Sequence, residues 1–138
     1  MKDIFCKIID GEIPSTKVYE DDDVLAILDV SQTTKGHTLV MPKKHYQDFL
    51  STPAPIAHKV YDIAQRLGQA MVGVLGAKGV NILTNAGEAA GQSVPHFHVH
   101  VIPRYTGGEG GFQISMKAQD TSGMDLPRLA LSIKEGIK

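Results

Sequence analysis

Three histidines alternate with apolar residues in the segment PHFHVHVIP, residues 95–103. Strict alternation of this kind predicts a β-strand, in which successive side chains point to opposite faces. We therefore expect His96, His98 and His100 on one face of the strand. The opposite face should enter the core, and it carries Phe97, Val99 and Val101. Imidazole titrates near neutral pH, so a row of three can supply a nucleophile, a proton carrier or a metal ligand.

Three interpretations fit such a row. Alternate histidines on a strand can converge on zinc or another transition metal. They can also perform phosphoryl or nucleotidyl transfer, in which one histidine is the covalent nucleophile and its neighbours manage phosphate charge and protons. The third interpretation is a polar surface strand without chemistry. The preceding residues favour phosphate, because Gly87 and Gly91 expose backbone N–H groups to an anion and Gln92 and Ser93 add hydrogen-bonding side chains.

The remaining elements must position this strand, and their patterns indicate an α+β fold. Apolar spacing predicts a short helix beginning at Ile4, a long amphipathic helix over residues 55–75 and a final helix around Leu126–Ile133. Further strands are predicted over residues 17–19, 24–29, 37–41 and 80–84. Residues 43–49 read as a short helix or turn, and the glycine-rich segment 106–112 as a mobile loop. The predicted architecture is a mainly antiparallel sheet with the long helix and the short helices on one side.

Composition narrows the class of protein. A chain of 138 residues fits one domain with a substantial core, and its net charge of -1 gives no general attraction for nucleic acid. The single cysteine excludes an internal disulfide framework. The first residues do not form a secretory signal, and no apolar run approaches the roughly 18 residues that span a membrane. We expect a cytoplasmic protein with no nucleic-acid or membrane partner.

Several separated motifs resemble the histidine triad (HIT) family. They are GHTLVMPKKH at 36–45, NAGEAAGQSV at 85–94 and HFHVHVIPR at 96–104. The segment DIFCKIIDGEIPSTKVYEDDDVLAILD at 3–29 is similar to the amino terminus of the family's Hint-like branch, bacterial type. On this basis residues 1–105 form the HIT domain core. Residues 106–138 are a C-terminal extension of the same domain, with the glycine-rich loop and the final helix.

The resemblance implies a function and an assembly. Proteins of this family are homodimers, and we expect the sheet to continue across the interface. They bind purine nucleotides and cleave nucleoside phosphoramidates or related adenylates at the α-phosphate through a nucleotidyl-histidine intermediate, with no cofactor required for catalysis. Two alternatives remain open: a nucleotide-binding regulatory or adaptor protein with slow, incidental turnover, and a dinucleoside polyphosphate hydrolase.

The resemblance also implies roles for individual residues. His98 matches the nucleophile, which must be neutral and needs an acceptor such as a backbone carbonyl for its other ring N–H. His100 matches the phosphate donor, with His37 and His96 as supporting histidines. Asp29 matches the acceptor for the ribose hydroxyls. The residues expected to contact phosphate or the leaving group are Asn85, Gln92 and Ser93. The apolar walls around the base correspond to Phe5, Ile8, Ile13, Ile27 and Leu28.

The sequence departs from the family's pattern at one position that bears on zinc binding. Some bacterial-type members carry Cys-x-x-Cys near the amino terminus and bind a structural zinc with two further histidines. Here the first of these positions is Asp3, and only Cys6 remains. Asp3, Cys6, His45 and His96 could form a mixed site, since zinc accepts carboxylate oxygen, but the loss of a thiolate should weaken it. No catalytic metal is expected.

Overall fold

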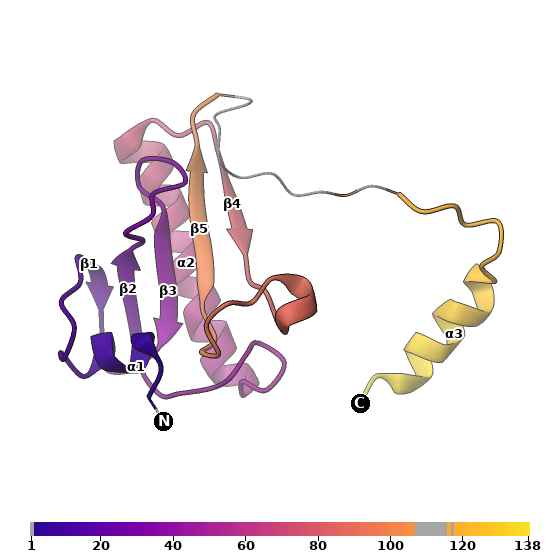
Figure 1. Ribbon diagram of the computed structural model, residues 1–138. Coiled ribbons are helices and arrows are strands. Elements are labelled where there is room, and N and C mark those ends of the chain that lie inside the picture. The colour runs from indigo at the N-terminus through magenta and orange to yellow at the C-terminus, as the bar shows by residue number, and fades with distance from the viewer. Residues whose placement is uncertain (1, 107–115, 117) are drawn as a thin grey trace.

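A five-stranded antiparallel sheet forms the centre of the chain, with strand order β1-β2-β3-β5-β4 (Figure 1). The computed structural model describes residues 2–106, 116 and 118–138. The strands are β1 (Lys17–Glu20), β2 (Val24–Leu28), β3 (Thr38–Pro42), β4 (Gly79–Leu83) and β5 (Val99–Arg104). The helices are α1 (Ile4–Ile9), α2 (Ala54–Leu75), the short 3-10 helix η1 (Glu88–Ala90) and α3 (Leu126–Gly136). The predicted α+β fold with an antiparallel sheet is confirmed.

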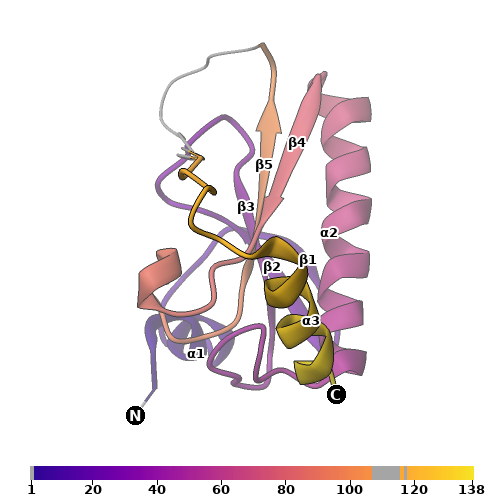
Figure 2. The same ribbon diagram turned by 90° about the vertical axis from the view of Figure 1, so that its right-hand side faces the viewer.

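The long helix α2 covers one face of the sheet, as Figure 2 shows from the side. It begins after Pro53 and ends at Gly76, whose φ of 74° is the left-handed conformation that terminates helices. Its apolar stripe packs on side chains of β2, β3 and β5, and the expected core residues Phe97, Val99 and Val101 all belong to this cluster. The alternation in the histidine segment therefore predicted the core-facing side correctly.

The short helix α1 lies over the other face of the sheet. Its first turn is capped by Asp3, whose side chain accepts a hydrogen bond from the backbone N–H of Cys6 at 2.8 Å. Phe5 of α1 is buried in a second apolar cluster, together with Leu25, Ile27, Leu39 and Met41. α1 thus does not share the face that α2 covers, and the histidines lie on its side of the sheet.

The histidine segment is shorter as a strand than its pattern predicts. β5 begins at Val99, so of the three histidines only His100 lies in it. The prediction of a strand over residues 95–103 is wrong at its beginning. There the chain bends back: the N–H of His96 donates to the carbonyl of Val94, and that of Phe97 donates to the carbonyl of Tyr46. The backbone before Val99 is therefore not paired in the sheet. The side chains from Phe97 onward still alternate between the two faces.

The C-terminal part holds the predicted final helix, α3, while most of the glycine-rich segment 106–112 lies outside the described residues. In the described part of the chain, no helix is both long and apolar enough to cross a membrane.

Candidate active site

His98, His100 and His37 lie together on the α1 side of the sheet. The ring centroids of His98 and His100 are 5.1 Å apart, and those of His37 and His100 are 5.2 Å apart. His37 directly precedes β3, and Leu39 of β3 pairs with His100 of β5, so antiparallel pairing brings the two imidazoles to one place. Long-range pairing thus assembles a group of residues separated by about 60 positions in the sequence.

The ring of His98 is held in one tautomer. Its Nδ1 lies 2.7 Å from the carbonyl oxygen of His96. A carbonyl only accepts, so Nδ1 carries the hydrogen and donates it. In the neutral ring the lone pair is then on Nε2. This is the backbone acceptor that a nucleophilic histidine needs.

A chain of hydrogen bonds likewise fixes the tautomers of His37 and His100. The backbone N–H of Thr33 donates to Nδ1 of His37 at 3.3 Å, so a neutral His37 carries its hydrogen on Nε2. That Nε2–H donates to Nδ1 of His100 at 2.9 Å. His100 therefore carries its own hydrogen on Nε2. The pair His98 and His100 then offers one ring with a free lone pair and one ring with a free N–H.

All three rings are held neutral near pH 7. Burial lowers the pKa of His98 and also that of His37. Burial, reinforced by the neighbouring rings of His98 and His37, lowers the pKa of His100 to about 4. A cation in this place would lose hydration and face the other imidazoles.

Asp29 lies at the end of β2 beside this group. One carboxylate oxygen accepts from the N–H of Ser31 at 2.8 Å, and the other lies 3.6 Å from Nε2 of His37. The side chain of Gln32 braces the same loop: its amide donates to the carbonyls of Asp29 and His37, and its oxygen accepts from the N–H of Gly36. The sequence did not single out Gln32, since a glutamine in a polar loop carries no signal of this role.

The side chain of His96 is directed elsewhere. It is fully buried, and its Nε2 donates to the carbonyl of Pro42 at 3.0 Å. Its Nδ1 faces the carboxylate of Asp3 at 3.3 Å and the sulfur of Cys6 at 3.6 Å. The ring of His96 is therefore directed away from the rings of His98 and His100. Its backbone carbonyl, by contrast, contacts the ring of His98.

His96 belongs to a second group, the N-terminal cluster, formed by Asp3, Cys6, His45 and His96. Nδ1 of His45 lies 3.0 Å from Asp3 and 3.5 Å from Cys6. One potential ligand atom of each residue lies within 4.8 Å of those of the others. Burial and the charge of Asp3 raise the pKa of the Cys6 thiol. The donor set of one sulfur, two nitrogens and one oxygen suits zinc.

The remaining predicted residues come from the segment between β4 and β5, from α1 and the residues after it, and from β2. Asn85 lies against Gly91, Ser93 is exposed, and Gln92 uses its side chain on the backbone of Gly87, Gln47 and Val94. Phe5 packs edge-on against His98, with centroids 4.9 Å apart. Ile27 is buried with Phe5, and Ile8 packs against the same cluster. Ile13 and Leu28 are half-buried.

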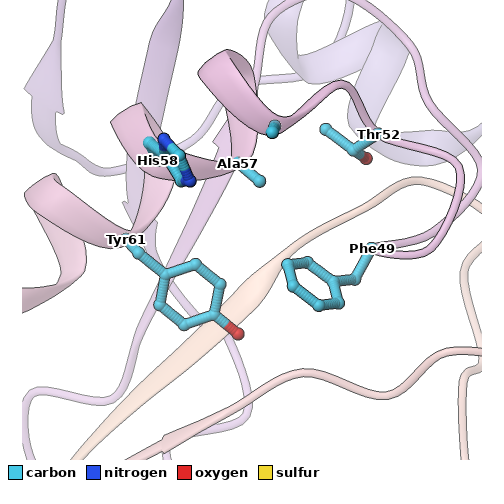
Figure 3. A pocket seen from close by; sticks show the side chains of 6 residues that line it. Phe49, Thr52, Ala57, His58 and Tyr61 are labelled. Atoms are coloured by element: carbon cyan, nitrogen blue, oxygen red, sulfur yellow. The ribbon is translucent and has the colours of Figure 1, made fainter. Parts of the chain in front are cut away.

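A separate pocket of about 290 Å³ lies between the start of α2 and residues 49–52 (Figure 3). Its lining is largely apolar and includes Phe49, Ala57 and Tyr61, with His58 at its rim. Phe49 contacts Phe97, which faces the α2 core. This pocket is therefore distinct from the histidine site.

Comparison with known proteins identifies the family. The HIT domain family model matches residues 10–107. The chain belongs to the HIT family. This HIT-family chain is also similar to a solved structure described as a member of the HIT family from Bacillus subtilis, with 44% identity and a TM-score of 0.91 over 100% of this chain and 99% of that one.

Two further relatives bear on chemistry. An Arabidopsis thaliana protein named adenylylsulfatase HINT3 is 43% identical over 73% of this chain, which spans 51% of the length of that protein. A zinc-bound histidine triad family protein from Mycobacterium smegmatis is 36% identical, with a TM-score of 0.75 over 97% of this chain and 96% of that one. The relatives therefore include a protein named as a hydrolase and a zinc-bound protein.

Proposed function

We propose that this HIT-family chain is a purine nucleotidyl hydrolase or transferase that cleaves nucleoside phosphoramidates or related adenylates at the α-phosphate. The observation that carries the proposal is the pairing of tautomers: the Nε2 lone pair of His98 beside the Nε2–H of His100. A nucleophile and an electrostatic donor side by side are what attack on a phosphate requires. The adenylylsulfatase activity named for the plant relative is the same class of reaction.

The proposed reaction has two displacements. Nε2 of His98 forms a bond to the α-phosphorus, and the bond from phosphorus to the leaving group breaks, with the leaving group taking up a proton from solvent. His100 donates its Nε2–H to a phosphate oxygen as charge develops there. Water then attacks the same phosphorus and gives up a proton to solvent, the P–N bond breaks, and nucleoside monophosphate and neutral His98 are released. The carbonyl of His96 stabilises the positive ring of His98 while the adduct exists.

Trapping the adduct tests this proposal. After rapid quenching of turnover with a radiolabelled adenylate, we expect label on His98 alone, stable to base and labile to acid. His98→Ala should abolish adduct and turnover while nucleotide affinity changes little, because a nucleophile acts mainly in the transition state. His58→Ala is the matched control, since it removes a histidine that lines the separate pocket. Turnover that survives His98→Ala would refute the mechanism.

A substrate panel separates the alternatives. Comparing kcat/KM for adenosine phosphoramidate, aminoacyl adenylate, adenylylsulfate and diadenosine polyphosphates identifies the leaving group. A value above about 10⁴ M⁻¹s⁻¹ for one substrate is in the range of committed enzymes. Values far below this for all substrates, with tight nucleotide binding, would favour the regulatory or adaptor function instead.

We further propose that the N-terminal cluster binds a structural zinc. His96 suits this role because its Nε2–H is fixed on the carbonyl of Pro42, which leaves Nδ1 directed at the cluster. Asp3 uses one oxygen to cap α1, and its other oxygen faces Nδ1 of His45 and Nδ1 of His96. A bound zinc would tie α1 to the sheet and take no part in the reaction.

Metal content and thermal stability test the zinc proposal. We expect close to one zinc per chain after equilibration with zinc, and a melting temperature that falls on chelation. Cys6→Ala should lose both the metal and the chelator effect, whereas Cys6→Ser keeps an oxygen and should retain weaker binding. Binding should also weaken as pH falls, because the ligands must be deprotonated. Equal melting temperatures with and without metal would contradict the proposal.

We also propose that two copies of the chain form a homodimer through β4. Within the described residues β4 pairs only with β5, so its outer edge is unpaired. Val72 and Leu75 of α2 and Ile82 of β4 are exposed by 50%, 38% and 45%. An unpaired strand edge is suited to sheet continuation, and exposed apolar side chains are suited to burial in an interface. Light scattering that finds only monomer at micromolar concentration would contradict this assembly.

A further inference from the structure

The loop between β2 and β3, residues 29–37, is closed by the side chain of Gln32. Its amide nitrogen donates to two backbone carbonyls, that of Asp29 at 2.6 Å and that of His37 at 2.8 Å. Its side-chain oxygen accepts from the backbone N–H of Gly36 at 2.7 Å. One exposed side chain therefore joins the beginning of the loop to its end.

Thr34 fixes the middle of the same loop to β5. Its side chain is buried, and its hydroxyl donates to the carbonyl of Pro103 at 2.5 Å. The carbonyl of Thr34 accepts from the backbone N–H of His37 at 3.1 Å. Thr33 is therefore held between Gln32 on one side and Thr34 on the other, and its own N–H is directed at Nδ1 of His37.

Two groups that set the tautomer of His37 belong to this closed loop. The N–H of Thr33 donates to Nδ1, so the hydrogen of the neutral ring lies on Nε2. The carboxylate of Asp29 lies 3.6 Å from Nε2, and its negative charge favours a hydrogen there. That hydrogen is donated to Nδ1 of His100. The hydrogen of His100 therefore lies on Nε2, the atom proposed to donate to phosphate.

The opposite tautomer of His37 would reverse this arrangement. With its hydrogen on Nδ1, His37 would present the lone pair of Nε2 to His100, and His100 would then carry its hydrogen on Nδ1. Nε2 of His100 would face a phosphate oxygen with a lone pair, so a repulsion would replace the donated hydrogen bond. A neutral imidazole can adopt both tautomers, and the hydrogen bonds around it select one of them.

From this geometry we infer that Gln32 is a positioning residue for the phosphate donor. By closing the loop it holds Thr33 and Asp29 where they fix the hydrogen of His37, and through His37 it fixes the hydrogen and the orientation of His100. Its effect on rate rests on the nucleotidyl transfer proposed above, whereas its effect on the ring hydrogens needs no substrate.

Nitrogen NMR of the histidine rings in the free protein tests the effect on the hydrogens, because a ring nitrogen resonates differently with and without a hydrogen. Near neutral pH we expect wild type to carry the hydrogen on Nε2 in both His37 and His100. One hydrogen bond biases an equilibrium by up to about tenfold, and the loop supplies two such contacts. In Gln32→Ala the Nδ1 resonances of both rings should therefore move together toward the N–H value, with at least about one molecule in ten in the other tautomer.

The matched control for the NMR measurement is Gln69→Ala, which removes an exposed glutamine from α2 on the opposite face of the sheet. It should leave the ring resonances of wild type unchanged. A purely structural role for Gln32 would lower the stability of Gln32→Ala without moving these resonances, and that result would overturn the inference. A hydrogen on Nδ1 of His100 in wild type would overturn it as well.

Turnover of adenosine phosphoramidate gives a second measurement. In Gln32→Ala we expect kcat to fall at least about fivefold, because the donor is lost in some molecules and displaced in the rest, and a misplacement near 1 Å costs up to about 10² in rate. Gln32→Glu keeps the acceptor for Gly36 but loses the donor to the two loop carbonyls, so it should fall similarly, whereas Gln69→Ala should stay within about twofold of wild type. Full activity in Gln32→Glu would overturn the inference.

A double-mutant cycle shows whether Gln32 acts through His100. In a His100→Ala background, adding Gln32→Ala should change kcat by less than about twofold, because the ring that the loop positions is already missing. An equal fall in both backgrounds would overturn the inference. If no substrate is turned over, the proposed function fails, and the ring resonances of the free protein still decide the role of Gln32.

Discussion

The low pKa of His100 makes the stability of the chain depend on pH in a predictable direction. Burial and two neighbouring imidazoles lower this pKa from 6.5 to about 4 in the folded protein. The unfolded chain therefore binds a proton at His100 more readily than the folded chain does. The free energy of unfolding must fall as pH drops below about 6.5 and stop falling from this cause near pH 4.

The magnitude follows from the two pKa values. Between pH 7 and pH 5, linkage gives a loss of about 2 kcal/mol from His100 alone. His100 is only partly buried and retains some contact with solvent, which reduces the figure to about 1–2 kcal/mol. The variant His100→Gln removes the titrating group and keeps a polar side chain. Its loss of stability over this range should be smaller than that of the wild type by the same amount.

Urea unfolding at pH 7 and pH 5, at one fixed protein concentration, measures this difference. His58→Gln is the control, because it removes an exposed histidine of α2 and should leave the wild-type dependence unchanged. If wild type and His100→Gln lose equal stability between the two pH values, then the site does not disfavour the His100 cation. The assignment of a neutral donor to His100 would fail with it.

Three other changes test the surroundings of the site. Asp29→Ala should weaken ribonucleotide binding at least tenfold and deoxyribonucleotide binding less than threefold in calorimetry, since a charge-assisted hydrogen bond contributes about 1.5–3 kcal/mol; equal losses would remove Asp29 from sugar recognition. Gly36→Ala should lower the free energy of unfolding by about 1–3 kcal/mol, because Gly36 has a φ of 105°, which side chains with a Cβ rarely adopt. The added Cβ would also displace Cδ1 of Leu75, which would lie 2.8 Å away, and an unchanged free energy of unfolding would contradict the prediction. Gln92→Ala should cost about 1–3 kcal/mol through three lost hydrogen bonds, and a larger effect on kcat than on stability would show instead that Gln92 contacts substrate.

The sequence predicted the core well because burial leaves a periodic pattern. Spacing alone predicts the core positions of Val60, Ile63 and Met71 in α2 and of Phe97, Val99 and Val101. The predicted beginning of the histidine strand was wrong, because alternation shows where side chains point and does not show whether the backbone is hydrogen-bonded to a neighbouring strand. Only the hydrogen bonds of His96 and Phe97 to Val94 and Tyr46 reveal that pairing begins at Val99.

The site was predicted in part for a similar reason. The grouping of His37 with His98 and His100 came from family resemblance, and strand pairing places them together. The separate direction of the His96 ring could not be read from the pattern, because it depends on contacts with Asp3 and the carbonyl of Pro42. Likewise, the side chain of Gln32 stabilises its loop through hydrogen bonds to backbone atoms. Such bonds cannot be predicted from the spacing of residue types.

His96 serves its two neighbourhoods through different atoms, and this limits what side-chain replacement can reveal. Its imidazole faces the N-terminal cluster, whereas its carbonyl oxygen orients His98. Every amino acid retains that carbonyl. Replacing His96 by alanine therefore tests the role of its side chain in the N-terminal cluster, and it does not test how the carbonyl orients the proposed nucleophile His98.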